Sequence, residues 1–137
     1  MRVFLDTNII YKLYRAYIAN QWRLWFSSIK DSGYELVIST TIVAELETVC
    51  QRKKTLLPIN HIPQFLSYME IWIMSSWQID HLYASYVYDQ KDIHVVQDAV
   101  WSKSKAILTH NLKDFNIAVI EDKLGIKIIV HLHQLNS

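Results

Sequence analysis

The sequence contains little cysteine, glycine or proline, and no long uninterrupted apolar run. Its 137 residues include one cysteine, two glycines and two prolines, against 51% hydrophobic residues. Disulfide scaffolds and cysteine-based zinc fingers are therefore excluded, because both need several thiols. Asp6, Asn8 and Lys12 interrupt the apolar N-terminal stretch, which falls far short of the roughly 20 residues that cross a bilayer and has no small-residue cleavage site. We expect a single compact domain over residues 1–137, in the cytoplasm.

The chain also lacks a strong excess of either charge, since its formal net charge is +1. Attraction of nucleic acid to the whole surface is therefore not expected, and any contact with RNA or DNA must use local clusters. Arg52, Lys53 and Lys54 form one such cluster, although a run of this kind is more often a solvated helix end. Cys50 lies in the same apolar helical run and is expected to be a buried structural thiol.

The first half of the chain alternates β-type runs with helical patterns. Residues 2–5 form a β-rich run, and the apolar residues that follow, over 9–29, have helical spacing. A second β-type run covers residues 34–38, after which Ser39 or Thr40 could cap another helix. The first half therefore predicts the order strand, helix, strand, helix.

The second half is patterned less regularly. We expect a helix over residues 65–73, and residues 77–88 are compatible with either helix or irregular structure. Asp92 opens an amphipathic helix, and residues 106–108 are typical of a buried strand. A short helix then leads to a last strand over residues 126–130.

Short strands that alternate with helices predict an α/β fold, a three-layer α/β/α sandwich with a central, mainly parallel sheet. Right-handed crossovers place helices on both faces of such a sheet, and ligands bind beyond the carboxyl ends of its strands. Asp6 and Asn111 follow strand ends, and Glu45 and Asp92 lie in the first turns of helices that begin at the same edge. We therefore expect these four side chains to face one cleft.

Each of these residues also has a purely structural interpretation. Asp6 and Asp92 could cap their helices, where aspartate is favoured. Glu45 is harder to explain in this way, because it lies on an otherwise apolar helix with no Lys or Arg within one turn. A buried carboxylate needs a partner. An external cation would supply one, as would a basic residue distant in sequence.

Three carboxylates in one cleft would repel one another and raise at least one pKa unless a cation neutralises them. Hard oxygen ligands, without a cysteine or histidine cluster, favour Mg²⁺ or Mn²⁺ over zinc. Such a metal lowers the pKa of a bound water and stabilises a leaving oxygen, which is the chemistry of phosphodiester hydrolysis. The pattern therefore predicts a metal-dependent nuclease that needs no protein nucleophile.

Four short motifs occur in a characteristic order: FLDTN at residues 4–8, AEL at 44–46, DQKDIHV at 89–95 and THNLKDF at 109–115. This ordered set resembles the PIN domain family, and most closely its branch of VapC-like toxin ribonucleases. The resemblance spans residues 3–130. It implies an α/β sandwich, Mg²⁺- or Mn²⁺-dependent endoribonuclease activity on RNA, homodimerisation, and inhibition by a small cognate antitoxin protein.

Position by position, the resemblance assigns the site. Asp6, Glu45 and Asp92 correspond to the metal-binding acids of the family, and these acids carry catalysis. Asn8 and Thr109 correspond to the polar residues that orient the acids or the water. Residues that bind the substrate are not identified by the motifs.

The fourth acid position departs from the family pattern. Many PIN domains carry Asp two residues after the threonine, where this chain has Asn111. The amide oxygen can still ligate a metal or hold a water in the catalytic site, but it supplies no charge. Asp114 either compensates as a metal ligand or caps the short helix that follows. Loss of this charge should weaken a second metal site first, so we expect a resting state with one metal.

Other titratable residues fit the site less well. Asp98 lies six residues beyond the acid that opens its helix, so it points about 120° away from it, and we expect it deeper, away from the strand ends. Asp89 either supports the site or is a solvated loop charge. His94 either contacts the substrate, supports an acid or is structural. His131 and His133 would share one face of a strand, and we expect them at the surface.

Two other functions compete with the nuclease. A phosphatase of the haloacid dehalogenase type also begins with an Asp at the end of its first strand, but it needs a second Asp two residues later as general acid. Asn8 cannot donate that proton. The alternative from a different class is a degenerate PIN domain that binds RNA or a partner protein without cleavage, for which Asn111 is the supporting observation.

Overall fold

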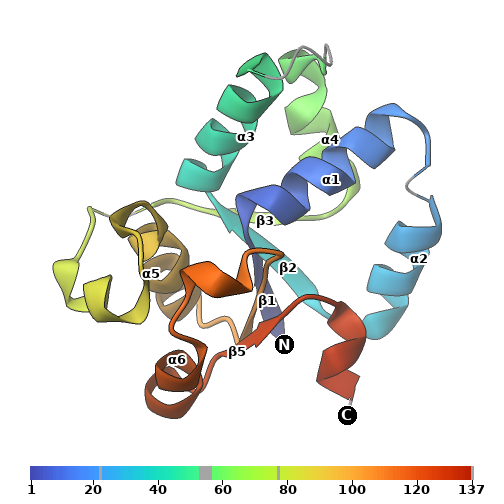
Figure 1. Ribbon diagram of the computed structural model, residues 1–137. Helices are drawn as coiled ribbons and strands as arrows, with labels where there is room; N and C mark the ends of the chain where they lie inside the picture. The colour runs from blue at the N-terminus through green and yellow to red at the C-terminus, as the bar shows by residue number, and fades with distance from the viewer. Residues whose placement is uncertain (22, 53–56, 77, 137) are drawn as a thin grey trace.

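A five-stranded parallel sheet forms the centre of the computed structural model (Figure 1), which describes residues 1–21, 23–52, 57–76 and 78–136. The order of the strands is β3-β2-β1-β4-β5, and all four pairings are parallel. The strands are β1 (Arg2–Leu5), β2 (Glu35–Ser39), β3 (Trp72–Met74), β4 (Ala106–Leu108) and β5 (Lys127–Ile129).

Helices connect the strands and cover both faces of the sheet. They are α1 (Thr7–Ile18), α2 (Arg23–Ser32), α3 (Thr40–Arg52), α4 (Ile62–Tyr68), α5 (Ile93–Trp101) and α6 (Ile117–Leu124). Short 3₁₀ turns, η1 to η5, cover Ile59–His61, His81–Tyr86, Gln90–Asp92, Leu112–Asp114 and Leu132–Asn136.

The chain runs outward from β1 to β2 and β3, then returns across the sheet to β4 and β5. Since crossovers are right-handed, helices of the outward and return paths lie on opposite faces. In agreement, α1 packs against α3 and α4, whereas α5 contacts β1 and β4, and α6 contacts β5 (Figure 1). The α/β/α sandwich expected from the sequence is confirmed.

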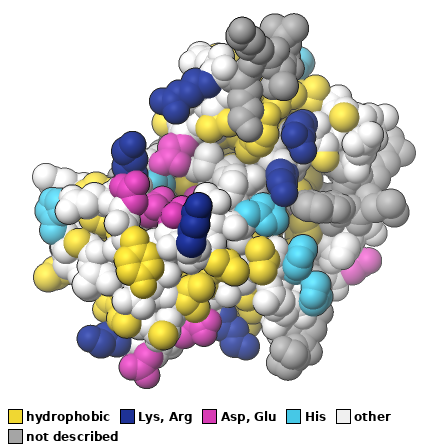
Figure 2. Space-filling view, in the orientation of Figure 1, with side chains coloured by type: hydrophobic (Ala, Val, Ile, Leu, Met, Phe, Trp, Pro, Cys, Tyr) yellow, Lys and Arg dark blue, Asp and Glu magenta, His cyan; other side chains and the backbone are white. Residues whose placement is uncertain are grey.

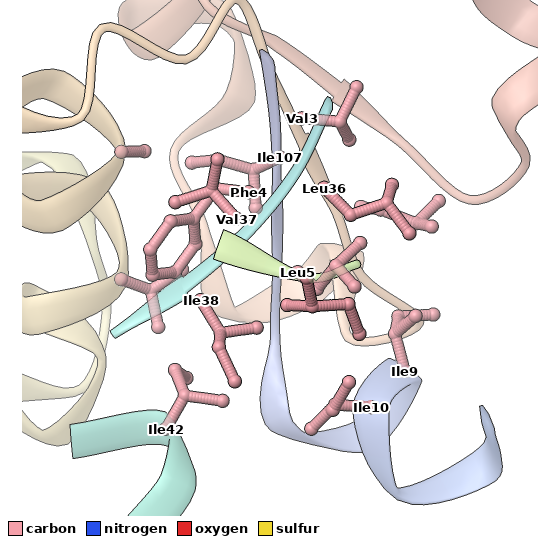
Figure 3. Close-up of a cluster of buried hydrophobic side chains, with 14 of the residues drawn as sticks. Val3, Phe4, Leu5, Ile9, Ile10, Leu36, Val37, Ile38, Ile42 and Ile107 are labelled. Atoms are coloured by element: carbon pink, nitrogen blue, oxygen red, sulfur yellow. The ribbon is translucent and has the colours of Figure 1, made fainter. Parts of the chain in front are cut away.

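The three central strands are apolar and almost completely buried, as expected for a sheet that is covered on both faces. Val3, Phe4 and Leu5 of β1 have no exposed surface. Figure 3 shows these side chains in the core, with Ile9 and Ile10 of α1 packed below them. This rigid centre fixes the loops that follow β1 and β4.

Local signals at the helix ends agree with the sequence. Ser39 accepts a hydrogen bond from the backbone N–H of Ile42 at 3.2 Å, so Ser39 caps the start of α3. Gly125 ends α6 in the left-handed conformation, with φ of 66°, which is the usual role of glycine there. Cys50 is buried, as predicted.

The helix expected over residues 65–73 is confirmed for residues 65–68 and wrong beyond them. Helix α4 ends at Tyr68, and Glu70 adopts a left-handed φ of 55°. The backbone N–H of Ile71 then bonds to Leu66, which closes the helix end. The remaining apolar residues form β3, an edge strand. A continuous apolar run does not distinguish one long helix from a short helix followed by a strand.

The last strand is shorter than expected. It ends at Ile129, so the two histidines do not share one face of a strand. His131 lies just before the turn η5, and His133 lies within it. Both are exposed, as predicted. Residues 78–88 contain the 3₁₀ turn η2, while Trp77 lies outside the described residues. Within the described ranges, no helix has the length and apolar character that a membrane span requires.

Candidate active site

Two neighbouring strands in the middle of the sheet are followed by polar residues. β1 and β4 are adjacent, and the chain leaves them toward opposite faces, so the edge between them is the topological switch point where ligands of such sheets bind. Asp6 follows β1 and Thr109 follows β4. The backbone N–H of Asp6 donates to the Leu108 carbonyl at 3.0 Å, which brings these two loops together.

Asp6 is held by hydrogen bonds on both carboxylate oxygens. Oδ1 accepts from the backbone N–H of Thr7 at 2.7 Å, so Asp6 does cap α1. Oδ2 accepts from the Thr109 hydroxyl at 2.8 Å and from the Asn8 amide at 3.2 Å. Burial raises the pKa of the Asp6 carboxyl, although the bonds from Thr109 and Thr7 offset part of the effect. Asp6 therefore caps α1 with one oxygen and presents the other toward the candidate site.

Asn8 and Thr109 are themselves fixed in orientation. Asn8 Oδ1 accepts from the backbone N–H of His110 at 3.0 Å, and Thr109 Oγ1 accepts from the backbone N–H of Asn111 at 3.1 Å. Each side chain therefore presents a donor to Asp6. The geometry is the one expected for residues that orient an acid.

Glu45 lies differently from the expectation. Helix α3 begins at Thr40, so Glu45 is in its second turn rather than its first, and its side chain is 40% exposed rather than buried. Oε1 pairs with His94 Nε2 at 2.6 Å, and the Thr7 hydroxyl donates to Oε2. The partner left open by the sequence is thus a basic residue 49 positions away, on α5.

The pair titrates as an ion pair. Burial would raise the pKa of Glu45, but the hydrogen bonds from His94 and Thr7 outweigh it, so the pKa is lowered. For His94, burial would lower the pKa, but the hydrogen bond and charge of Glu45 raise it. Both shifts favour the charged forms, which hold the Glu45 carboxylate in place.

Asp98 lies one turn after His94 on α5 and is fully buried. Burial raises its pKa, and it accepts a hydrogen bond from the Ser76 hydroxyl at 3.3 Å. Because Ser76 follows β3, Asp98 reaches the carboxyl edge of the sheet, and its expected position away from the strand ends is wrong. Of the described side chains, His94 Nδ1 and Asp98 Oδ1 are the buried atoms that have no hydrogen-bond partner.

Asp92 precedes α5, but its side chain makes no capping hydrogen bond. Burial raises the pKa of its carboxyl to about 6, and the negative charges of Asp6, Asp114 and Asp89 add to the effect. Asp92 therefore occupies the N-cap position of α5 without the hydrogen bond of a capping side chain. We refer to Asp92 and the two acids that raise its pKa, Asp6 and Asp114, as the acid cluster.

Asn111 and Asp114, the two candidates for the fourth position, lie in different surroundings. Asn111 is exposed, and its side chain makes no capping contact. Asp114 is half-buried in η4 and acts on the pKa of Asp92. The next helix, α6, has Asn116 at its N-cap position, so Asp114 does not cap it. Asp114 is thus an acid of this segment whose charge reaches Asp92.

The remaining candidates lie at the periphery. Asp89 is exposed and accepts from the backbone N–H of Lys91 at 3.0 Å, so it caps the turn η3 as well as acting on Asp92. Arg52 is exposed at the end of α3. Lys53 and Lys54 lie outside the described residues. The sequence left open that His94 supports an acid and that a distant basic residue is the partner of Glu45, but it did not join the two residues in one pair, as the structure does.

The donor set suits a hard divalent cation by charge and by atom type, since oxygen donors dominate it. Figure 2 shows acidic side chains gathered where α3, α5 and the segment after β4 meet, with Lys and Arg side chains on either side. As the side chains stand, no three His, Cys, Asp or Glu residues in the described ranges enclose a metal position. The charges of Asp6 and Asp114 nevertheless reach Asp92, whose pKa they help to raise.

Comparisons with known proteins agree with the fold. The sequence profile of the PIN domain family matches residues 2–113. The fold is similar to a chain in the crystal structure of VapBC2 from Rickettsia felis bound to a DNA fragment from their promoter, with a TM-score of 0.60 and 16% identity over 93% of this chain and 97% of that chain. No curated protein matches the chain. The profile match covers most of the sequence, and the chain belongs to the PIN domain family.

Proposed function

We propose that the protein is a metal-dependent endoribonuclease that hydrolyses phosphodiester bonds in RNA. The observation that carries the proposal is the acid cluster: burial raises the pKa of Asp92 to about 6, and the negative charges of Asp6 and Asp114 add to the effect at the switch point of the sheet. Like charges kept together need a cation. Membership of the PIN domain family, whose members are generally metal-dependent nucleases, supports the same chemistry.

The residues that would hold Mg²⁺ or Mn²⁺ are Asp6, Glu45, Asp92 and Asp114. The bonds from Thr7 and His94 do not remove Glu45 from this set, because each carboxylate oxygen has two acceptor positions. When bound, such an ion lowers the pKa of a water and stabilises the leaving oxygen.

The chain's own residues prepare this site. Thr109 and Asn8 fix the direction of the Asp6 carboxylate, and His94 does the same for Glu45. Asn111 offers a neutral amide oxygen beside Thr109, which suits holding a water or a substrate oxygen rather than a second cation. Because the amide of Asn111 supplies no charge, we propose a single resident metal.

We further propose that the nuclease is the toxin of a toxin–antitoxin pair, acting in the cytoplasm and inhibited by a small antitoxin protein. The support is the similarity of fold to a chain of the VapBC2 structure, together with the ordered motifs of the sequence. In that structure the promoter DNA is bound to VapBC2. Homodimerisation is proposed on the same basis.

The nuclease proposal is tested by incubating the purified protein with structured RNA in Mg²⁺ or Mn²⁺, with EDTA as the metal-free arm. We expect cleavage with metal, none in EDTA, and none from Asp6→Asn. Asp89→Asn is the matched control, because it removes a nearby exposed acid while keeping the cap of η3. Cleavage that persists in EDTA, or in Asp6→Asn, contradicts the mechanism.

The second candidate function is a PIN domain that binds RNA or a protein without cleaving. Asn111 is the observation that favours it, because the amide removes one negative charge from the usual set. The same assay separates the two functions: RNA that is bound but intact in Mn²⁺ supports the binding module. The toxin role is tested by expression in bacteria, which should arrest growth, and Asp92→Asn should relieve the arrest.

A further inference from the structure

A groove of about 860 Å³ opens beside the acid cluster, between α1, α2 and the segment after β5. Its floor is apolar and includes Leu5, Leu13 and Leu108. No Asp or Glu among the described residues lines it. The basic and histidine side chains that line it are Lys12, Arg15, His110, His131 and His133.

The groove adjoins the acid cluster through the chain itself. Leu5 precedes Asp6 at the end of β1, and Leu108 and His110 lie on either side of Thr109. Leu5 and Leu108 are partners in the register of β1 and β4. Figure 2 shows His, Lys and Arg side chains gathered beside the acidic ones on the same face. A ligand that fills the groove would therefore extend to the acid cluster.

The positive groups of the groove are close enough to act on one another. Burial lowers the pKa of His110, and the positive charges of Lys12 and His131 lower it further. The lasting positive charges of the groove are therefore those of Lys12 and Arg15, and an anion is the partner that matches them.

The histidines add a flat surface to the rim. The rings of His131 and His133 are stacked, with centroids 5.2 Å apart and an interplanar angle of 13°. Both residues are exposed, so the outer faces of the pair remain accessible. Stacked rings of this kind are platforms for unpaired bases.

We propose that this groove binds a single-stranded segment of the RNA substrate, with phosphates on Lys12 and Arg15 and a base on the His131–His133 pair. Phosphates match the charge of the rim, and base faces match the apolar floor. A duplex would present its phosphates but not its base faces. The inference rests on the proposed function, because it supplies the site that holds the RNA while the acid cluster acts.

Binding is measured by fluorescence anisotropy with a labelled single-stranded RNA in EDTA, so that cleavage plays no part. We expect the double variant Lys12→Ala/Arg15→Ala to weaken binding about tenfold at low salt, and to reduce the slope of affinity against salt by about 1.4, since each lost phosphate contact removes about 0.7. Lys123→Ala is the matched control, because it removes an exposed lysine on α6, away from the groove.

The base contact is measured separately. His131→Ala/His133→Ala should weaken single-stranded RNA about tenfold, and should leave the weaker binding of a duplex of equal length unchanged. All variants alter exposed side chains, and their melting temperatures should match that of the wild type.

Three results would overturn the groove proposal: equal binding of RNA by the lysine–arginine double variant and by Lys123→Ala, duplex bound as tightly as single strand, or polyglutamate competing as well as RNA. The last result would assign the groove to an acidic polypeptide. Because the measurement is made in EDTA, it is independent of cleavage. Loss of RNA binding in the groove variants, together with no cleavage in Mn²⁺, would keep the groove and reject the nuclease.

Discussion

The acid cluster and the basic groove lie side by side, and each collects charge of one sign. They differ in how the charge is held. Asp6 is buried and bonded on both oxygens, so it cannot move away from its neighbours. The groove carries its charge on long, exposed side chains such as Lys12 and Arg15, which can move apart. Fixed charges suit a reaction centre, where preorganisation lowers the barrier, and adaptable charges suit binding.

The largest expected effect is kinetic: a change in the acid cluster should lower kcat, and a change in the groove should raise KM. Asp6→Asn should lower the cleavage rate at saturating RNA by at least about a hundredfold, because even the loss of a supporting residue costs roughly 10–100-fold. Its RNA affinity in EDTA should be unchanged or tighter, since one repelling charge is gone. Lys12→Ala/Arg15→Ala should instead raise KM and leave kcat. If both variants change KM alone, the distinction between the regions is wrong.

The next effect concerns how rigidly the acid is held. Thr109→Val keeps the shape of the side chain but removes the hydroxyl that donates to Asp6 at 2.8 Å. We expect activity and Mn²⁺ affinity to fall roughly 10–100-fold, as for other residues that orient a ligand. Thr109→Ser retains the hydroxyl and should retain most of both. Equal losses in the two variants would assign Thr109 to packing only.

A similar test applies to the pair of Glu45 and His94. His94→Ala leaves the carboxylate without its partner at 2.6 Å, so Mn²⁺ affinity, measured by titration calorimetry, should fall about tenfold. His94→Gln keeps an N–H donor on the side chain and should recover part of the loss. We expect less than for Thr109 because the Glu45 side chain is 40% exposed. No recovery in His94→Gln would show that the ring itself is required.

Much of the acid cluster and of the sheet that carries it could be predicted from the sequence. Asp6, Asp92 and Thr109 directly follow or precede regular elements, so chain order alone predicts their meeting at one edge of a parallel sheet. The strands of the centre were equally clear, because residues 2–5 and 106–108 are short apolar runs. Local sequence patterns predict well those site residues that lie directly at the ends of strands and helices.

The rest depends on contacts between distant side chains. Glu45 on α3 and His94 on α5 belong to helices on opposite faces of the sheet. The spacing of apolar residues within each helix cannot predict that these two side chains meet. Strand β3 was missed because its three residues continue the apolar run of α4. The groove was missed because its lining comes from α1, α2, β4 and the segment after β5, whose proximity is a property of the fold.

The smallest effect tests whether charge in the acid cluster costs stability. The pKa of Asp92 is raised from 3.8 to about 6 in the folded protein, so without metal the folded state binds the proton more tightly than the unfolded state. Stability therefore rises as pH falls through 6 toward 4. Asp92→Asn lacks this titration. Above about pH 6 the metal-free variant should melt on the order of a few degrees higher than the wild type, and below about pH 4 the two should converge.

With bound metal, we expect the wild type to melt at a higher temperature than Asp92→Asn. With Mn²⁺ at about pH 7.5, the wild type should gain stability from binding, whereas Asp92→Asn has lost a charged ligand and should gain less. Lys123→Ala, on the exposed surface of α6, should follow the wild type throughout. If Asp92→Asn melts at the same temperature as the wild type at every pH without metal, neither burial nor the neighbouring acids raise the pKa of Asp92 in the folded protein. The charge of the acid cluster would then give no reason for a bound cation.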